Sequence, residues 1–157
     1  MSLRFVPLTP QLLDLALGLC RDPATIALVA AAIARAPEAL FVPGVSFAAL
    51  DGGLLAGAGG LAPCWPGRAG GWWLVTGHAR PRHLAAAARY ARALLDRVQA
   101  DPASGPLYRR IEIAILAAAP WRQSFAAALG FELEATMRRW SNQGLDTCQY
   151  VRIWEGA

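Results

Sequence analysis

A strand, a long helix and a second strand follow one another in the middle of the chain. Residues 71–77 read GWWLVTG, an aromatic and β-branched run typical of a buried strand. Residues 84–99 carry apolar side chains at helical spacing with arginines on the opposite side, which predicts an amphipathic helix. In residues 109–116, RRIEIAIL, isoleucine alternates with other residues as in a strand. Because a helix crosses between them, we expect the two strands to be parallel neighbours that splay at their carboxyl ends.

Two helix starts carry the same pair of signals. Thr9 and Asp22 can each accept a hydrogen bond as an N-cap, and each precedes a proline, which suits the first helical position. We therefore expect one helix from residue 10 to about Cys20. A second helix is expected over residues 23–36.

The segment that follows these helices predicts a hairpin and a loop. Residues 46–50 and 54–62 are apolar runs separated by Asp51-Gly52-Gly53, which is typical of a tight turn between two strands. Residues 63–71, PCWPGRAGG, are rich in proline and glycine. We expect a loop there.

The last part of the chain predicts a short helix and a second hairpin. Proline and glycine at the two ends of residues 120–130 suit the first position and the C-cap of a helix. Residues 131–140 and 147–154 are expected to be strands. Asn142 and Gly144, between them, suit turn positions.

The complete element order defines the fold class. With a short strand at residues 3–8, the order is β-α-α-β-β-β-α-β-α-β-β. The chain has 157 residues, of which 55% are hydrophobic and 17% are charged, enough to bury a sizeable core. We predict a single α/β domain over residues 1–157, with a mixed, mostly antiparallel sheet.

Composition also limits the partners and the location. The apolar runs end well before the ~18 residues that a spanning helix needs, and no leader sequence is recognisable, so we expect a soluble cytoplasmic protein without a membrane partner. All fifteen basic residues are arginine, and the net charge is +4. A GC-rich coding sequence also produces this composition, so we predict no nucleic-acid partner. Cys20, Cys64 and Cys148 have no paired spacing, and we expect buried thiols.

A motif at the last helix-to-strand junction carries a family resemblance. Residues 129–132 read LGFE, and together with the element order they resemble the GNAT superfamily of acetyl-CoA-dependent N-acetyltransferases over nearly the whole chain. PGRAGGWW and the ending QYVRIW look most like GNAT-type proteins encoded by bacteriophages. The resemblance implies acetyl-CoA as cofactor and an amine as acetyl acceptor, which is not identified further.

The resemblance also implies a site for the cofactor pyrophosphate. The family turn reads Arg or Gln, two residues, Gly, one residue, then Gly or Ala, and it aligns with residues 80–85. Here His83 replaces the glycine that lets a phosphate approach the backbone, and Pro81 removes one amide donor. Charged side chains could compensate. The implied cofactor-binding residues are Leu74, Val75, Thr76, Arg80, Arg82, His83 and Ala85.

Two family positions that assist proton transfer hold alanine. Family members often carry a tyrosine four residues before the glycine of LGF, as the acid for the CoA thiolate, and an asparagine further upstream. These positions are Ala126 and Ala119, neither of which can donate a proton. The family oxyanion donor would be a backbone amide in residues 74–76.

Two residues are candidate bases for the acceptor amine. His78 lies at the end of the strand over residues 71–77, and Glu112 lies on the neighbouring strand. The alternatives are a solvated loop histidine and an ion-pair partner of Arg109 or Arg138. His78 and His83 have no neighbouring Cys, Asp or Glu to complete a metal shell, so we predict no metal site.

Two function classes remain open. The chain is either an acetyl-CoA-dependent N-acetyltransferase with weakened chemistry or a non-catalytic GNAT-like module. In the second class it would bind protein assembly partners and could belong to a phage virion. The altered turn and the missing tyrosine favour the module, whereas the complete architecture and the arginines favour the enzyme.

Overall fold

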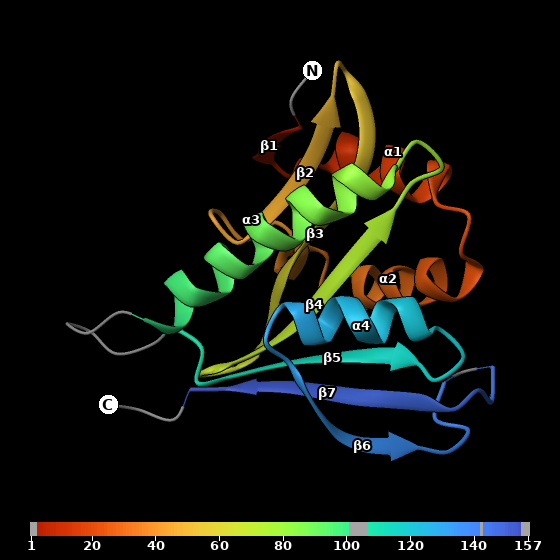
Figure 1. Cartoon of the computed structure of the whole chain (residues 1–157), viewed down its shortest axis with the longest axis vertical. Coiled ribbons are helices and arrows are strands. Elements are labelled where there is room, and N and C mark those ends of the chain that lie inside the picture. The colour runs from red at the N-terminus through yellow and green to blue at the C-terminus, as the bar shows by residue number, and fades with distance from the viewer. Residues whose placement is uncertain (1–2, 101–106, 142, 155–157) are drawn as a thin grey trace. The chain divides into compact units, whose positions relative to one another are not determined.

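The computed structural model describes residues 3–100, 107–141 and 143–154 (Figure 1). Its elements follow the expected order, and the described strands form one mixed sheet in the order β1-β2-β3-β4-β5-β7-β6. The strands are β1 (Arg4–Pro7), β2 (Ser46–Asp51), β3 (Leu54–Trp65), β4 (Arg68–Val75), β5 (Arg110–Leu116), β6 (Glu132–Met137) and β7 (Thr147–Ile153). The helices are α1 (Pro10–Leu19), α2 (Pro23–Arg35), α3 (Pro81–Gln99) and α4 (Pro120–Ala128), with a 3-10 turn η1 (Pro37–Leu40).

The chain divides into two compact units. The first comprises Met1–Pro63 and Gly71–Ala87, and the second comprises Cys64–Gly70 and Ala88–Ala157. Strand β4 and helix α3 each contribute residues to both. The single-domain organisation expected from the sequence stays a prediction.

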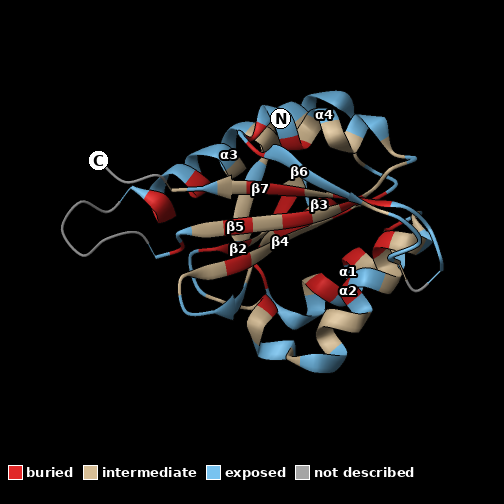
Figure 2. Ribbon diagram, turned by 90° about the horizontal axis from the view of Figure 1, so that it is seen from below, coloured by how far each residue is buried: buried red, intermediate tan, exposed pale blue. Residues whose placement is uncertain are grey.

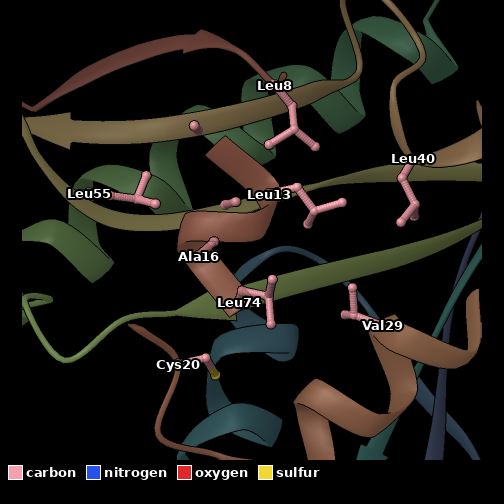
Figure 3. Close-up of a cluster of buried hydrophobic side chains, with 10 residues drawn as sticks. Leu8, Leu13, Ala16, Cys20, Val29, Leu40, Leu55 and Leu74 are labelled. Atoms are coloured by element: carbon pink, nitrogen blue, oxygen red, sulfur yellow. The ribbon is translucent and has the colours of Figure 1, made fainter. Parts of the chain in front are cut away.

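The first unit is built around one apolar cluster. Strand β2 pairs antiparallel with β1 and with β3. Leu13 of α1, Val29 of α2, Leu55 of β3 and Leu74 of β4 are each at most 4% exposed and pack in this cluster (Figure 3). Each fully buried leucine contributes about 1.5–3 kcal/mol. The helices α1 and α2 therefore hold the carboxyl end of β4 in a fixed place.

Both expected N-caps are confirmed. The Thr9 hydroxyl accepts from the Leu12 N–H at 3.3 Å, and α1 begins at Pro10. The Asp22 carboxylate accepts from the Ala24 N–H at 3.1 Å, and α2 begins with a proline. Each cap satisfies an otherwise orphaned helix donor.

The second unit is built on β5. Its isoleucines at 111, 113 and 115 are each at most 3% exposed and share one face of the strand. Tyr150 of β7 lies opposite Ile113, and its hydroxyl donates to Gln123 of α4 at 3.2 Å, so α4 covers this face (Figure 2). The first three residues of β4 pair in parallel with β5, which confirms the predicted parallel neighbours. The splay beyond them stays a prediction.

Three expectations about local structure are wrong. Residues 63–71 are not a loop, because β3 extends to Trp65 and β4 begins at Arg68, and only Pro66-Gly67 separates them. Gly67 has φ +74°, so this pair turns the chain in two residues. Helix α3 begins at Pro81, three residues before the expected start, since a first helical residue needs no N–H. Cys64 is exposed, whereas Cys20 and Cys148 are buried.

The terminal hairpin is confirmed where the structure describes it. Helix α4 ends before Gly130, which adopts φ +84°, and β6 pairs antiparallel with β7. Gly144 has φ +69° in the turn, and Asn142 lies outside the described residues. Within the described parts of the chain, every helix is too short or too polar to cross a membrane.

Candidate functional site

The end of β4 is anchored to β3 through Thr76. The Thr76 N–H donates to the Ala56 carbonyl at 3.1 Å, and its hydroxyl donates to the Leu55 carbonyl at 2.6 Å. Successive residues of an antiparallel ladder direct their N–H groups to opposite edges, so the Val75 N–H points away from β3. Leu74 is 1% exposed and belongs to the core. Of the three residues predicted to offer an oxyanion donor, Val75 has the suitably directed amide.

The connection between α1 and α2 lies along the other edge of the same strand end. The Gly77 N–H donates to the Leu19 carbonyl at 3.1 Å, and Cys20 forms an isolated antiparallel bridge with Thr76. A Cβ placed on Gly77 would lie 2.9 Å from Nε of Arg21. The Arg21 guanidinium group therefore lies against the turn between β4 and α3.

Arg21 is a candidate binding residue that the sequence did not reveal. Its side chain is exposed, and no carboxylate of the described residues pairs with it. Arg80, which the sequence did predict, is likewise exposed and has no carboxylate partner in those parts of the chain. Two guanidinium groups that have no carboxylate partner among the described residues thus come from this turn and from the connection beside it.

Arg82 and His83, the two other side chains predicted in this turn, contact Asp51 of β2, so the expectation that no Asp lies near His83 is wrong. His83 is only 6% exposed, and its Nε2 lies 3.0 Å from Oδ2 of Asp51. The Nδ1 atom of His83 accepts from the Arg80 N–H at 3.2 Å. Arg82 donates from Nη2 to Oδ2 of Asp51 at 2.8 Å. Arg82 and His83 are therefore tied to the β2–β3 hairpin.

These contacts fix the tautomer of the histidine. Because Nδ1 of His83 accepts a hydrogen bond, the proton of the neutral ring is on Nε2 and is donated to Asp51. The Nε–H of Arg82, 3.2 Å from the same Nε2, cannot then donate to it. Hydrogen bonds from Arg82 and then His83 lower the pKa of Asp51 below its usual value, against an opposing effect of desolvation. Asp51 is thus an ionised acceptor.

Most backbone amides of the turn already have acceptors within the chain. Pro81 has no N–H, and Ala85 lies exposed inside α3. Of the eight residues from Gly77 to Leu84, those with an internally bonded amide are Gly77, His78, Ala79, Arg80, His83 and Leu84. An anion at this turn would therefore rely on guanidinium groups more than on backbone amides.

The two candidate bases have different environments. The ring of His78 is exposed, and no described carboxylate bonds to it. In the second unit, the Glu112 carboxylate is 16% exposed and accepts two hydrogen bonds of 2.6 Å from Nη2 of Arg68 and one of 3.2 Å from Nε of Arg110. A base at Glu112 would have to give up two ion pairs.

The partners expected for Glu112 are wrong. We expected Arg109 or Arg138, whereas the carboxylate binds Arg68 and Arg110. The parallel register, with Arg68 opposite Arg110, brings both guanidinium groups beside Glu112.

The alanines at the two family positions offer no acid. Ala126 is 0% exposed, in the core of the second unit, and Ala119 is the N-cap of α4 without a side-chain hydrogen bond. Across the described residues, no three His, Cys, Asp or Glu side chains gather as a metal site would require.

The fold is similar to that of several solved N-acetyltransferases. No family model and no curated protein matches the sequence. A chimera of the Vibrio cholerae spermidine N-acetyltransferase SpeG and hSSAT is 12% identical, with 98% of this chain and 97% of that chain covered, at a TM-score of 0.66. Ard1 from Thermoplasma volcanium is 11% identical, with 99% of this chain and 100% of that chain covered, at a TM-score of 0.66. A chain of the NatC complex bound to Gag peptide and CoA is 15% identical, with 98% of this chain and 99% of that chain covered, at a TM-score of 0.67.

These matches concern the fold. They cover nearly the full length of both chains, so the GNAT fold predicted from residues 129–132 and the element order is confirmed. At 11–15% identity they show the fold alone. The narrower resemblance to bacteriophage proteins stays a prediction.

Proposed function

We propose that the protein transfers an acetyl group from acetyl-CoA to an amine. The observation that carries this proposal is the end of β4, where the Val75 N–H is directed away from β3. Beside it lie two guanidinium groups without a carboxylate partner among the described residues: Arg80 of the following turn, and Arg21 of the connection between α1 and α2. A strand-edge amide suits a polarised carbonyl, and guanidinium groups suit phosphate oxygens. The fold brings these groups together at one strand end, although Arg21 is distant from the other two in the sequence.

The residues at the turn fit the phosphates of CoA through side-chain charge. Gly77 leaves the space in which the Arg21 guanidinium lies, and Arg80 extends from the same turn. Arg82 and His83, predicted as phosphate ligands, would instead position the turn, because both contact Asp51. Acetyl-CoA supplies a thioester whose carbonyl carbon an amine can attack.

The chain itself supplies few proton-transfer groups. The Val75 N–H would donate to the carbonyl oxygen as negative charge develops on it. With Glu112 held by two guanidinium groups, His78 is the better placed of the two predicted bases to accept the amine proton, directly or through water. Ala126 cannot protonate the leaving thiolate, so solvent must do so. We therefore expect slow turnover.

A non-catalytic binding module is the second candidate. Two observations favour it: most turn amides are already hydrogen-bonded within the chain, and Ala126 offers no acid. Such a module would use the fold to bind an assembly partner, as a virion protein of a bacteriophage would. Tight CoA binding without acetyl transfer to any amine would favour this reading.

Calorimetric titration with acetyl-CoA tests the cofactor site. We expect Arg21→Gln and Arg80→Gln each to weaken binding by roughly tenfold, since a charge-assisted hydrogen bond contributes about 1.5–3 kcal/mol and both groups are exposed. Arg4→Gln, an exposed arginine on β1 with the same change in charge, is the matched control and should bind as the wild type does. If all three variants bind acetyl-CoA equally weakly, the effect comes from net charge and not from a site at this turn.

Acetyl transfer is then measured with an amine panel. The panel contains a polyamine, a peptide with a free N-terminus and a peptide with an internal lysine and a blocked N-terminus. Transfer to one class would identify the acceptor. Wild-type protein without heat of binding at millimolar acetyl-CoA would overturn the proposed function.

A further inference from the structure

A buried histidine stands where the family turn has glycine. Helix α3 begins at Pro81, so Arg80 is its N-cap residue and His83 its third residue. In a capping box, the side chain of the third residue accepts from the N-cap N–H, and His83 does so through Nδ1 at 3.2 Å. Because His83 is 6% exposed, its ring lies inside the turn and not in solvent.

Asp51 determines which nitrogen of the ring can accept. Its Oδ2 atom, 3.0 Å from Nε2 of His83, receives the ring proton and leaves Nδ1 free to accept from Arg80. Gly52 and Gly53 follow Asp51 in the hairpin turn with φ +58° and +90°. The carboxylate therefore lies at a defined place, directly opposite the first turn of α3.

We infer that Asp51 and His83 form a latch that closes the Arg80 N–H to anions, because Nδ1 of His83 occupies the place on this amide where a phosphate oxygen would otherwise bind. The inference rests on the proposed function, because it concerns access to the same site. Asp51 and His83 are positioning residues in it. An anion that uses the Arg80 amide must first displace the histidine ring.

The latch predicts a gain of binding when its acceptor is removed. His83→Ala frees the Arg80 N–H for an incoming oxygen, and we expect CoA to bind on the order of tenfold more tightly, as one additional hydrogen bond to a charged group allows. His83→Gln keeps an acceptor that can reach back to the N-cap amide and should bind CoA as the wild type does. A merely structural histidine would give weaker binding in the less stable variant.

A second pair of variants separates the latch from local charge. Asp51→Ala and Asp51→Asn remove the same negative charge beside Arg82, but only asparagine keeps an acceptor for Nε2 of His83. Asp51→Ala should therefore increase CoA affinity more than Asp51→Asn. Equal increases would assign the effect to charge and overturn the latch.

The experiment titrates CoA and inorganic pyrophosphate into the wild type and the four variants by calorimetry, and records thermal unfolding in parallel. Tighter binding by His83→Ala despite a lower melting temperature supports the latch. If the wild type binds and His83→Ala binds no more tightly, the latch is wrong and the proposed function stands. If only His83→Ala and Asp51→Ala bind, the latch stands and the proposed function of the wild type is overturned. If no protein binds either probe, both proposals fail.

Discussion

The close approach of β3 to the carboxyl end of β4 can be tested with one methyl group. A Cβ on Gly57 would lie 2.6 Å from the carbonyl oxygen of Leu74, which must retreat by about 0.4 Å to reach the 3.0 Å limit of real Cβ contacts. Backbone atoms cannot rotate away as a side chain can. Overpacking of this kind costs about 1–3 kcal/mol, and the lower backbone entropy of unfolded alanine offsets about 0.5–1 kcal/mol.

We therefore expect Gly57→Ala to lower the free energy of unfolding by about 1 kcal/mol, or the melting temperature by about 2–4 °C. The matched control is Gly18→Ala in α1, where a Cβ would meet nothing within 4 Å. The free energy of unfolding of this control should rise by about 0.5–1 kcal/mol, because alanine is favoured over glycine in an exposed helix. Thermal and urea unfolding measure both variants.

The same substitution has a functional consequence. Displacement of the Leu74 carbonyl moves the neighbouring Val75, so Gly57→Ala should also weaken acetyl-CoA binding, whereas Gly18→Ala should not. Unfolding curves in which Gly57→Ala is as stable as the wild type would refute the strand spacing on which the site at β4 depends.

Three further predictions concern the charged and buried groups. Hydrogen bonds from Arg82 to Asp51, and from Arg110 to Glu134 of β6, lower the pKa values of the two carboxyl groups below their usual 3.8 and 4.5. The stabilisation they give is therefore complete above about pH 5 and is lost as pH falls through the lowered values, and urea midpoints from pH 6 to pH 2 measure this loss. Ala126→Tyr should destabilise the protein by about 1–3 kcal/mol without faster acetyl transfer, because position 126 is 0% exposed. Glu112→Gln should leave the pH profile of transfer unchanged, whereas His78→Ala should remove the limb in which the rate rises with pH. The reverse result would identify Glu112 as the base.

Local signals in the sequence predicted the elements well. Thr9 and Asp22 cap their helices because the acceptor, the proline and the helix start are consecutive in the chain. The alternation at residues 111–115 predicted the buried face of β5 because it requires only the pleat of a strand. Proline and glycine at positions 66 and 67 were ambiguous, since they suit a two-residue turn as well as a longer loop.

The site residues that the sequence missed depend on distant contacts. Arg21 lies against Gly77, 56 positions further along the chain. In the sequence, Arg21 is marked only by the helix cap next to it and Gly77 only by the end of a strand, so neither segment indicates their contact. The sequence predicts Asp51 as part of a turn, and it is the last residue of β2, directly before that turn, but its contact with His83 depends on where β2 ends relative to α3. The partners of Glu112 follow from a parallel register that no single segment encodes.

The two departures from the family pattern differ in what could reverse them. Ala126 is enclosed by the core of the second unit, so a tyrosine there must displace packed side chains before it can act as an acid. His83 instead makes two hydrogen bonds, one to a backbone amide and one to Asp51, and a single substitution releases the amide without refilling a core. One change can therefore strengthen cofactor binding, whereas one change cannot supply efficient proton delivery to the thiolate. Slow transfer that persists in a tightly binding His83→Ala variant would place the limit on proton transfer and not on cofactor affinity.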